Sequence, residues 1–280
     1  MKLAQKIAVG YLRTKFRILT SISKKKAAEK AFDLFCTPQS RNKKKLPKIF
    51  EKAEQIQFRF ENQQIIGYRW NHPAERKLMI IHGFESSVIN FDRYIKPLTS
   101  KGYEVLAIDA PAHGRSTGKS INAVIYKDLI RHIYMHYGPA QSFLAPSLGG
   151  LALCLALEEI QHDQNYRVAL IAPATETATA IDHFFRFLQL DNALRKEFEK
   201  RIIELGGKPA DWYSIRRALR NIQAKVLWFH DEEDNITLLT DAMKVKEENF
   251  SNVEFVITKG LGHQRIYRDN TVSKAVIEFL

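Results

Sequence analysis

Short apolar runs that alternate with helical stretches constrain the fold of this chain more than any other feature. A continuous apolar run of about five residues is typical of a strand that is covered on both faces. Strands of this kind are predicted at residues 77–81, 104–108, 142–144, 167–171, 225–229 and 253–257. Helical periodicity occupies residues 88–101, 121–137, 148–161 and 272–280. Strands and helices in this order predict an α/β fold, with a mostly parallel central sheet, right-handed crossovers and helices on both faces.

A hairpin is predicted in front of the first buried strand. Residues 56–60 alternate apolar and polar side chains, as a half-buried strand does. Residues 61–63 (Glu-Asn-Gln) suit a turn, and residues 64–70 return as the partner strand. We therefore expect the ordered α/β domain to begin near Ala53 and to span residues 53–280.

The alternation stops between the strands at 167–171 and 225–229. Residues 175–220 show helical periodicity with a Gly-Gly break at 206–207, and no strand pattern. In an open α/β sheet, an insertion after a strand lies above the carboxyl edge, where ligands bind. Because it is longer than an ordinary connection, we interpret residues 175–222 as a helical cap. A separate domain is the weaker alternative at this size.

Residues 1–52 form a basic extension in front of the α/β domain. Residues 1–50 hold 14 Lys and Arg against two Asp and Glu, which equals the whole net charge of +12. Leu3, Ile7 and Tyr11 fall at helical spacing, as do residues 28–35, so two amphipathic helices joined by Lys24–Lys26 are expected. Residues 37–45 have the composition of a linker.

Two interpretations of this extension remain open. It could lie on an anionic membrane surface or contact an acidic partner, or it could pack its apolar stripe on the main domain. Nucleic acid is not expected, because no base-reading motif accompanies the charge. No cleavable signal sequence or bilayer-spanning run is evident, and Cys36 and Cys154 lie too far apart for a metal or disulfide pattern. We expect a cytoplasmic protein. Peripheral association with the inner membrane surface is the alternative.

A serine stands at the end of the third buried strand. Residues 143–146 (Phe-Leu-Ala-Pro) lead into Ser147, which is followed by Leu-Gly-Gly and a helical pattern. A serine on a sharp strand-to-helix turn exposes its hydroxyl, and the next amides open a helix that can stabilise negative charge. A serine at such a junction can also be a simple turn residue. The rest of the chain has to decide between the two.

Polar loops follow other strands of the predicted sheet. A His-Gly turn stands at 82–83, and Asp-Ala-Pro-Ala-His-Gly-Arg-Ser at 109–116. An acidic loop (His-Asp-Glu-Glu-Asp) occupies 230–234, and Gly262-His263 follows the last strand. A carboxylate and a histidine on neighbouring strand ends can meet Ser147 across the edge of the sheet.

Together these motifs resemble the α/β-hydrolase superfamily over about residues 56–280. The resemblance implies a triad with Ser147 as nucleophile, Asp234 as acid and His263 as base. It also implies an oxyanion hole formed by the N–H groups of Phe84 and Leu148. Such a triad needs no metal or organic cofactor, and the substrate-binding residues stay open.

The sequence departs from the family pattern at two residues of the elbow and at one residue of the acid loop. Ala145 replaces the first glycine of the elbow, and Pro146 precedes the serine, so Pro146 must be the last residue of its strand. Asp231 stands where the acid loop usually has glycine, and Asp231, Glu232 and Glu233 compete with Asp234 for the role of acid.

The predicted function is a serine hydrolase that cleaves a carboxylic ester, a thioester or a small amide. The expected partner is a small-molecule acyl substrate. The alternative is a non-catalytic protein of the same fold that binds a small molecule or a partner. Peptidase, lipase and thioesterase activities share this machinery and cannot be ranked from the sequence.

Overall fold

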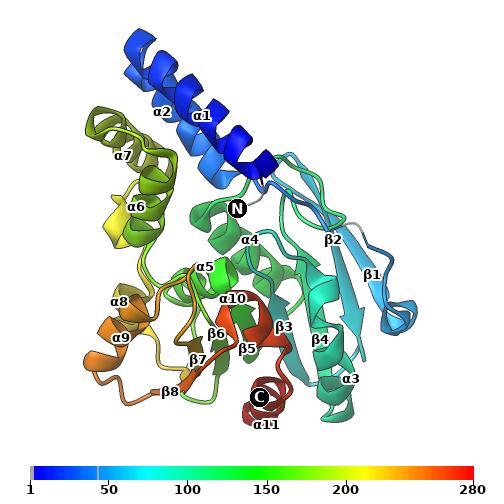
Figure 1. Cartoon of the computed structure of the whole chain (residues 1–280). Helices are drawn as coiled ribbons and strands as arrows, with labels where there is room; N and C mark the ends of the chain where they lie inside the picture. The colour runs from blue at the N-terminus through cyan, green and yellow to red at the C-terminus, as the bar shows by residue number, and fades with distance from the viewer. Residues whose placement is uncertain (1–2, 43) are drawn as a thin grey trace. The chain divides into compact units, whose positions relative to one another are not determined.

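The computed structural model describes residues 3–42 and 44–280. The predicted extension starts at Met1 and its linker contains Lys43; residues 1, 2 and 43 lie outside the described residues. Contacts divide the chain into two compact units. The described residues up to 37 join 176–213 in a helical unit, and residues 38–175 join 214–280 in a sheet unit (Figure 1).

The sheet unit contains eight strands in the order β1-β2-β4-β3-β5-β6-β7-β8. β2 is antiparallel to both β1 and β4, and the other neighbours are parallel. The predicted hairpin and all six predicted strands are present, so the α/β fold is confirmed. β8 was predicted to be buried, but its residues are half-buried or exposed, because it is an edge strand of the sheet. The strands are β1 Glu54–Phe60, β2 Gln63–Trp70, β3 Arg76–Ile81, β4 Tyr103–Asp109, β5 Ser142–Pro146, β6 Arg167–Ile171, β7 Lys225–Asp231 and β8 Val253–Thr258.

Helices follow most of these strands. The α-helices are α3 Asp92–Ser100, α4 Ala123–His136, α5 Ser147–Leu157, α8 Ile215–Ala218, α9 Leu239–Glu247, α10 Gly262–Arg265 and α11 Asn270–Phe279. The 3-10 turns are η1 Lys48–Lys52, η2 Val88–Phe91, η4 Leu219–Asn221 and η5 Ile266–Arg268. The sequence did not predict α9, because this helix buries only Asp241, Ala242 and Val245 and so lacks a clear apolar stripe.

The core positions α5, and with it Ser147. Leu78 and Ile80 of β3 belong to a core cluster that includes residues of α3 and α11. α5 contacts α4, and its residues from Gly149 to Leu157 are all buried. A helix that is apolar on every side is stable only when it is surrounded. Its N-terminus is therefore held firmly at the carboxyl end of β5 (Figure 1).

Residues 38–52, assigned to the extension from sequence, belong to the sheet unit. Phe50 is 5% exposed, and its ring centroid lies 4.9 Å from that of Tyr68 and 5.0 Å from that of Trp70. The indole N–H of Trp70 donates to the Ile49 carbonyl at 2.9 Å. The boundary thus falls after residue 37, because an aromatic contact overrides the basic composition on which the predicted boundary rested.

The helical unit combines the N-terminal helices with the inserted segment. Its elements are α1 Leu3–Ile22, α2 Lys24–Cys36, α6 Thr177–Leu188, α7 Asn192–Gly206 and η3 Ala210–Trp212. Aromatic rings join α2 to α7, with Phe32 and Phe35 lying 5.6 and 5.9 Å from Phe198. The predicted cap reached residue 222, whereas residues 214–222 belong to the sheet unit. That the inserted helices act as a cap stays a prediction. No helix in the described part of the chain has the length and apolarity needed to cross a membrane.

Candidate active site

The turn between β5 and α5 holds Ser147 in an unusual backbone conformation. β5 ends at Pro146 as predicted, and α5 begins at Ser147. Ser147 has φ +51°, in the left-handed region that residues with a Cβ rarely adopt. A backbone held there costs about 1–3 kcal/mol, and such residues cluster at functional sites. The turn therefore has the strained backbone expected of a nucleophile elbow.

Three glycines allow the neighbouring chain to pass close to the elbow. A Cβ on Gly83 would lie 2.8 Å from the Cβ of Ser147. A Cβ on Gly149 would lie 2.6 Å from the carbonyl oxygen of His82, and one on Gly150 would lie 3.1 Å from that of Ala145. Gly149 and Gly150 therefore allow α5 to approach these strands closely.

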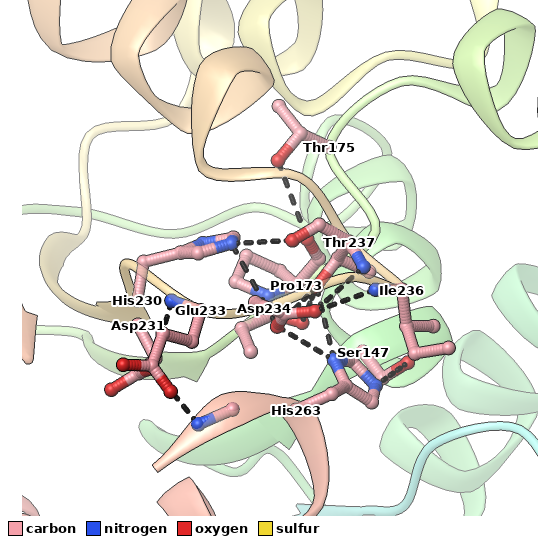
Figure 2. A network of polar contacts seen from close by, with 12 residues as sticks. Ser147, Pro173, Thr175, His230, Asp231, Glu233, Asp234, Ile236, Thr237 and His263 are labelled. Atoms are coloured by element: carbon pink, nitrogen blue, oxygen red, sulfur yellow. Dashed lines mark hydrogen bonds and ion pairs between the residues drawn. The ribbon is translucent and has the colours of Figure 1, made fainter. Parts of the chain in front are cut away.

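Ser147, His263 and Asp234 form a continuous chain of hydrogen-bonding contacts (Figure 2). The distance from His263 Nε2 to Ser147 Oγ is 3.1 Å. The distance from His263 Nδ1 to Asp234 Oδ2 is 2.8 Å. An ionised carboxylate only accepts hydrogen bonds, so Nδ1 carries the proton and Nε2 is left to accept from the serine hydroxyl.

Several donors keep the Asp234 carboxylate ionised. Oδ1 accepts hydrogen bonds from the amides of Ile236 and Thr237, both at 2.9 Å. Burial raises the pKa of Asp234, but the bond and charge of His263 and these two amides outweigh it, so the net pKa lies below the usual value. The buried acid is thus a fixed negative charge beside the imidazole.

Thr237 is a neighbour of the acid that the sequence did not single out. Its Oγ1 lies 2.9 Å from Asp234 Oδ2, 3.1 Å from His263 Nδ1 and 3.1 Å from the Ala172 carbonyl oxygen. The imidazole of the buried His230 donates to the Thr237 carbonyl at 2.7 Å. The signal in the sequence is the spacing Asp234-x-x-Thr237, which suits an acid that caps the following turn.

The geometry separates Asp234 from the three competing carboxylates. Glu232 is paired with Lys259 at 3.2 Å and is exposed. Glu233 is also exposed, and its amide donates to Asp231. Among the described residues, Asp234 is the carboxylate within hydrogen-bonding distance of His263.

Asp231 ties the acid loop to the loop that carries His263 (Figure 2). Its Oδ1 accepts from the amides of Glu233 at 3.0 Å and Gly262 at 2.8 Å. Its Oδ2 accepts from the Thr258 hydroxyl at 2.7 Å and the Leu261 amide at 3.1 Å. Burial raises the pKa of Asp231, but these four donors outweigh it and the net pKa is lowered. The carboxylate found in place of the family's glycine therefore fixes the position of the histidine loop.

We expect Asp231→Asn to lower both stability and activity. The amide keeps one acceptor oxygen and turns an NH2 group toward groups that themselves donate. Losing about two charge-assisted bonds costs about 2–3 kcal/mol in the free energy of unfolding. Displacing His263 should lower kcat about tenfold or more with a smaller change in KM. Urea denaturation and steady-state ester kinetics measure the two effects.

Glu232→Gln is the matched control, because it removes the same charge from the same loop without touching a buried bond. It should change stability by less than about 0.5 kcal/mol. Equal behaviour of Asp231→Asn and Glu232→Gln would show that Asp231 does not hold the loop.

The predicted oxyanion donors lie on either side of the elbow. Leu148 is in the first turn of α5, where amides have no acceptor inside the helix. Phe84 follows Gly83, whose backbone passes against Ser147. Within the described part of the chain, neither amide has a protein acceptor.

His82, Asp109 and His113 organise the loops beside Ser147. His82 Nδ1–H donates to the Gly83 carbonyl at 2.7 Å, and Nε2 accepts from the Ala110 amide at 2.9 Å. His113 Nε2 accepts from the Glu85 amide at 3.0 Å. The Asp109 carboxylate accepts hydrogen bonds from two further loop amides, those of Val88 and Arg115. These residues support the loop of the predicted oxyanion hole and do not touch the triad.

The two buried imidazoles make stability depend on pH. Burial lowers the pKa of His82 to about 4 and that of His113 to about 3. Between these values and about 6.5, the unfolded chain binds protons that the folded chain does not, so stability falls as pH falls. From pH 7 to pH 5, each histidine should contribute a loss on the order of 2 kcal/mol. Urea denaturation at both pH values should show a smaller loss in His113→Gln than in wild type.

A control substitution of the exposed His136 to Gln should keep the wild-type pH dependence. If His113→Gln lost as much stability as wild type between pH 7 and pH 5, the neutral buried state of His113 would be refuted.

The described residues contain no group of three or more His, Cys, Asp or Glu side chains that could hold a metal ion.

Comparisons with known proteins agree with this architecture. A family model described as "serine aminopeptidase, S33" matches residues 72–214, half of the chain. A search of curated proteins finds no match.

Solved structures with a similar fold include three hydrolases. An esterase from Pyrococcus furiosus is 22% identical, with 88% of this chain and 97% of the esterase covered and a TM-score of 0.64. A putative lipase from Acinetobacter baumannii AYE is 16% identical, with coverage of 82% and 90% and a TM-score of 0.59. The thioesterase domain from the curacin biosynthetic pathway is 15% identical, with coverage of 80% and 99% and a TM-score of 0.57. At these identities, the likeness establishes the fold alone.

Proposed function

Because the chain belongs to the serine aminopeptidase S33 family of the α/β-hydrolase superfamily, we propose that it is a serine hydrolase that cleaves a carboxylic ester through an acyl-enzyme on Ser147. One observation carries the proposal. Ser147 begins α5, His263 lies in α10 and Asp234 lies in the loop after β7, and their side chains form one chain of contacts at 3.1 and 2.8 Å. Such a chain is what activates a serine hydroxyl.

In the first half of the reaction, Ser147 Oγ attacks the carbonyl carbon of the substrate. Its proton passes to His263 Nε2, and the charge of Asp234 stabilises the imidazolium that forms. When the tetrahedral intermediate collapses, the bond from carbon to the leaving oxygen breaks. The leaving group takes the proton from His263, and the acyl group stays on Ser147.

The second half repeats these steps with water. His263 Nε2 takes a proton from water, the hydroxide attacks the acyl carbon, and the proton returns to Ser147 Oγ as the acid leaves. The amides of Phe84 and Leu148 are the proposed donors to the oxyanion in both halves. Each such donor is worth about 3 kcal/mol in a transition state.

A thioester or a small amide is cleaved by the same sequence of steps. The family description names aminopeptidases, and the similar structures include an esterase and a thioesterase domain. A carboxylic ester remains the proposed substrate. Comparing the rates for an ester, a thioester and an anilide of the same acyl group tests this choice directly.

The test uses partitioning of the acyl-enzyme. Several butyrate esters with different leaving alcohols are hydrolysed in the presence of hydroxylamine, which competes with water for the acyl group. A common acyl-enzyme predicts the same ratio of hydroxamate to butyric acid for every leaving group. A ratio that changes with the alcohol would contradict the acyl-enzyme. The complete absence of ester, thioester and anilide hydrolysis would instead favour the non-catalytic binding protein.

A further inference from the structure

Helix α1 has an inner apolar face that packs within the helical unit. Phe16 is buried, and Leu12 and Leu19 are half-buried. α1 contacts both α2 and α6, and Arg13 donates to the Phe187 carbonyl of α6 at 2.6 Å. The packed face of α1 therefore consists of these residues and not of Ile7 and Tyr11, which the sequence predicted for the apolar stripe and which are exposed.

A second apolar face of α1 is exposed. At about 100° per residue, the four positions fall within roughly 60° of one another around the helix axis. Large apolar side chains aligned on one exposed face mark an interaction surface rather than random variation. The members of this outer stripe, with their exposed fractions, are Ile7 (65%), Tyr11 (66%), Ile18 (57%) and Ile22 (75%).

The charged side chains of α1 are all of one sign. α1 contains no Asp or Glu, and its Lys15 and Arg17 are exposed near the stripe. The exposed run Lys24–Lys26 opens α2 directly after the end of the stripe. A surface that complements this helix must be apolar at its centre and anionic around it.

We propose that α1 docks on an anionic lipid surface through the outer stripe. The apolar side chains would enter the boundary between headgroups and acyl chains, and the basic side chains would reach the anionic headgroups. Lys and Arg can do so from the flank of a helix, because their stems are apolar. A second copy of α1 is a poorer occupant, because the like charges of two such helices would face each other. The proposal does not depend on the hydrolase function.

The test is sedimentation of the full chain with vesicles. Vesicles of phosphatidylcholine with about a quarter phosphatidylserine are compared with vesicles of phosphatidylcholine alone. We expect at least tenfold stronger partitioning onto the anionic vesicles, and a loss of most of it in 0.5 M salt, as screening demands. The Ile7→Gln/Ile18→Gln/Ile22→Gln variant should partition at least tenfold more weakly, and so should Lys15→Gln/Arg17→Gln.

Matched controls change exposed residues of the same type in the sheet unit. Met135→Gln removes an exposed apolar side chain, and Lys119→Gln/Lys274→Gln removes two exposed charges. Both should bind like wild type, and every variant should keep its hydrolysis of a short soluble ester.

Equal binding to neutral and anionic vesicles, or binding unaffected by the α1 substitutions, would overturn the proposal. So would a wild type that ignores vesicles but forms a dimer that the triple Ile variant loses, since the stripe would then contact a second copy. If a variant fails to fold, the effect of salt on vesicle binding by the wild type still tests whether the basic side chains contribute to that binding.

Discussion

Ser147→Ala is expected to lower kcat/KM for a short p-nitrophenyl ester by about 10⁴-fold or more. Removing the nucleophile of a serine triad leaves only the contribution of binding and of the oxyanion donors. Alanine has the same difficulty with φ +51° as serine, so the free energy of unfolding should change little. The rate is measured by release of p-nitrophenol, and folding by urea denaturation.

Ser251→Ala, in the exposed turn before β8, is the matched control and should keep full activity. Ser147→Gly adds an independent test of the elbow. It should be as inactive as Ser147→Ala but more stable by about 1 kcal/mol, because glycine adopts the left-handed conformation without strain. Full activity in Ser147→Ala or in Ser147→Gly would refute the assignment of Ser147 as the nucleophile.

Asp234→Asn is expected to lower kcat about 10³- to 10⁴-fold. The amide NH2 group cannot accept the proton of His263 Nδ1, so the imidazole turns to the wrong tautomer and its cation loses its counter-charge. The amides of Ile236 and Thr237 would still bond the remaining carbonyl oxygen, so the loop should keep its shape. Stopped-flow or steady-state ester kinetics measure the loss.

Glu233→Gln is the control for the acid, since it removes a carboxylate one residue away. The structure places Glu233 on the exposed side of the loop, and we expect no more than a twofold change in kcat. A large loss in Glu233→Gln together with a small loss in Asp234→Asn would exchange the roles of the two residues.

The sheet could be predicted from sequence because its central strands are buried on both faces. Residues 78–81 and 168–171 are continuously apolar, as expected of strands that are covered on both faces. The helix α9 could not be predicted in the same way. It lies at the edge of the unit, where three buried positions are too few to create a period.

The sequence predicted the residues of the candidate triad, but it did not predict the hydrogen bonds that hold them in place. Ser147 and His263 stand at strand ends that the pattern reveals, and the structure places them 3.1 Å apart. The family resemblance assigned Asp234 as the acid. The residues alone could not, because four carboxylates follow one another at positions 231–234. The conformation of the turn distinguishes these carboxylates. Asp231 accepts a hydrogen bond from the Gly262 amide, and Asp234 contacts the imidazole of His263.

The partner of the basic extension could not be predicted from sequence. An apolar stripe on a helix shows that something covers it, but not which element does. The aromatic contacts of Phe32 and Phe35 with Phe198 connect segments that are more than 150 residues apart. The sequence placed Ile7 and Tyr11 on the apolar stripe of α1, whereas the structure exposes both and packs Phe16 instead.

Labelling with a fluorophosphonate tests the central claim most directly. This reagent phosphonylates a serine only when a neighbouring base activates it, and mass spectrometry of the digested protein locates the adduct. We expect a single adduct on Ser147 in the wild type, with labelling at least about 10³-fold slower in a folded His263→Gln variant. A folded wild type that carries no adduct on Ser147, or that labels no faster than His263→Gln, would contradict it.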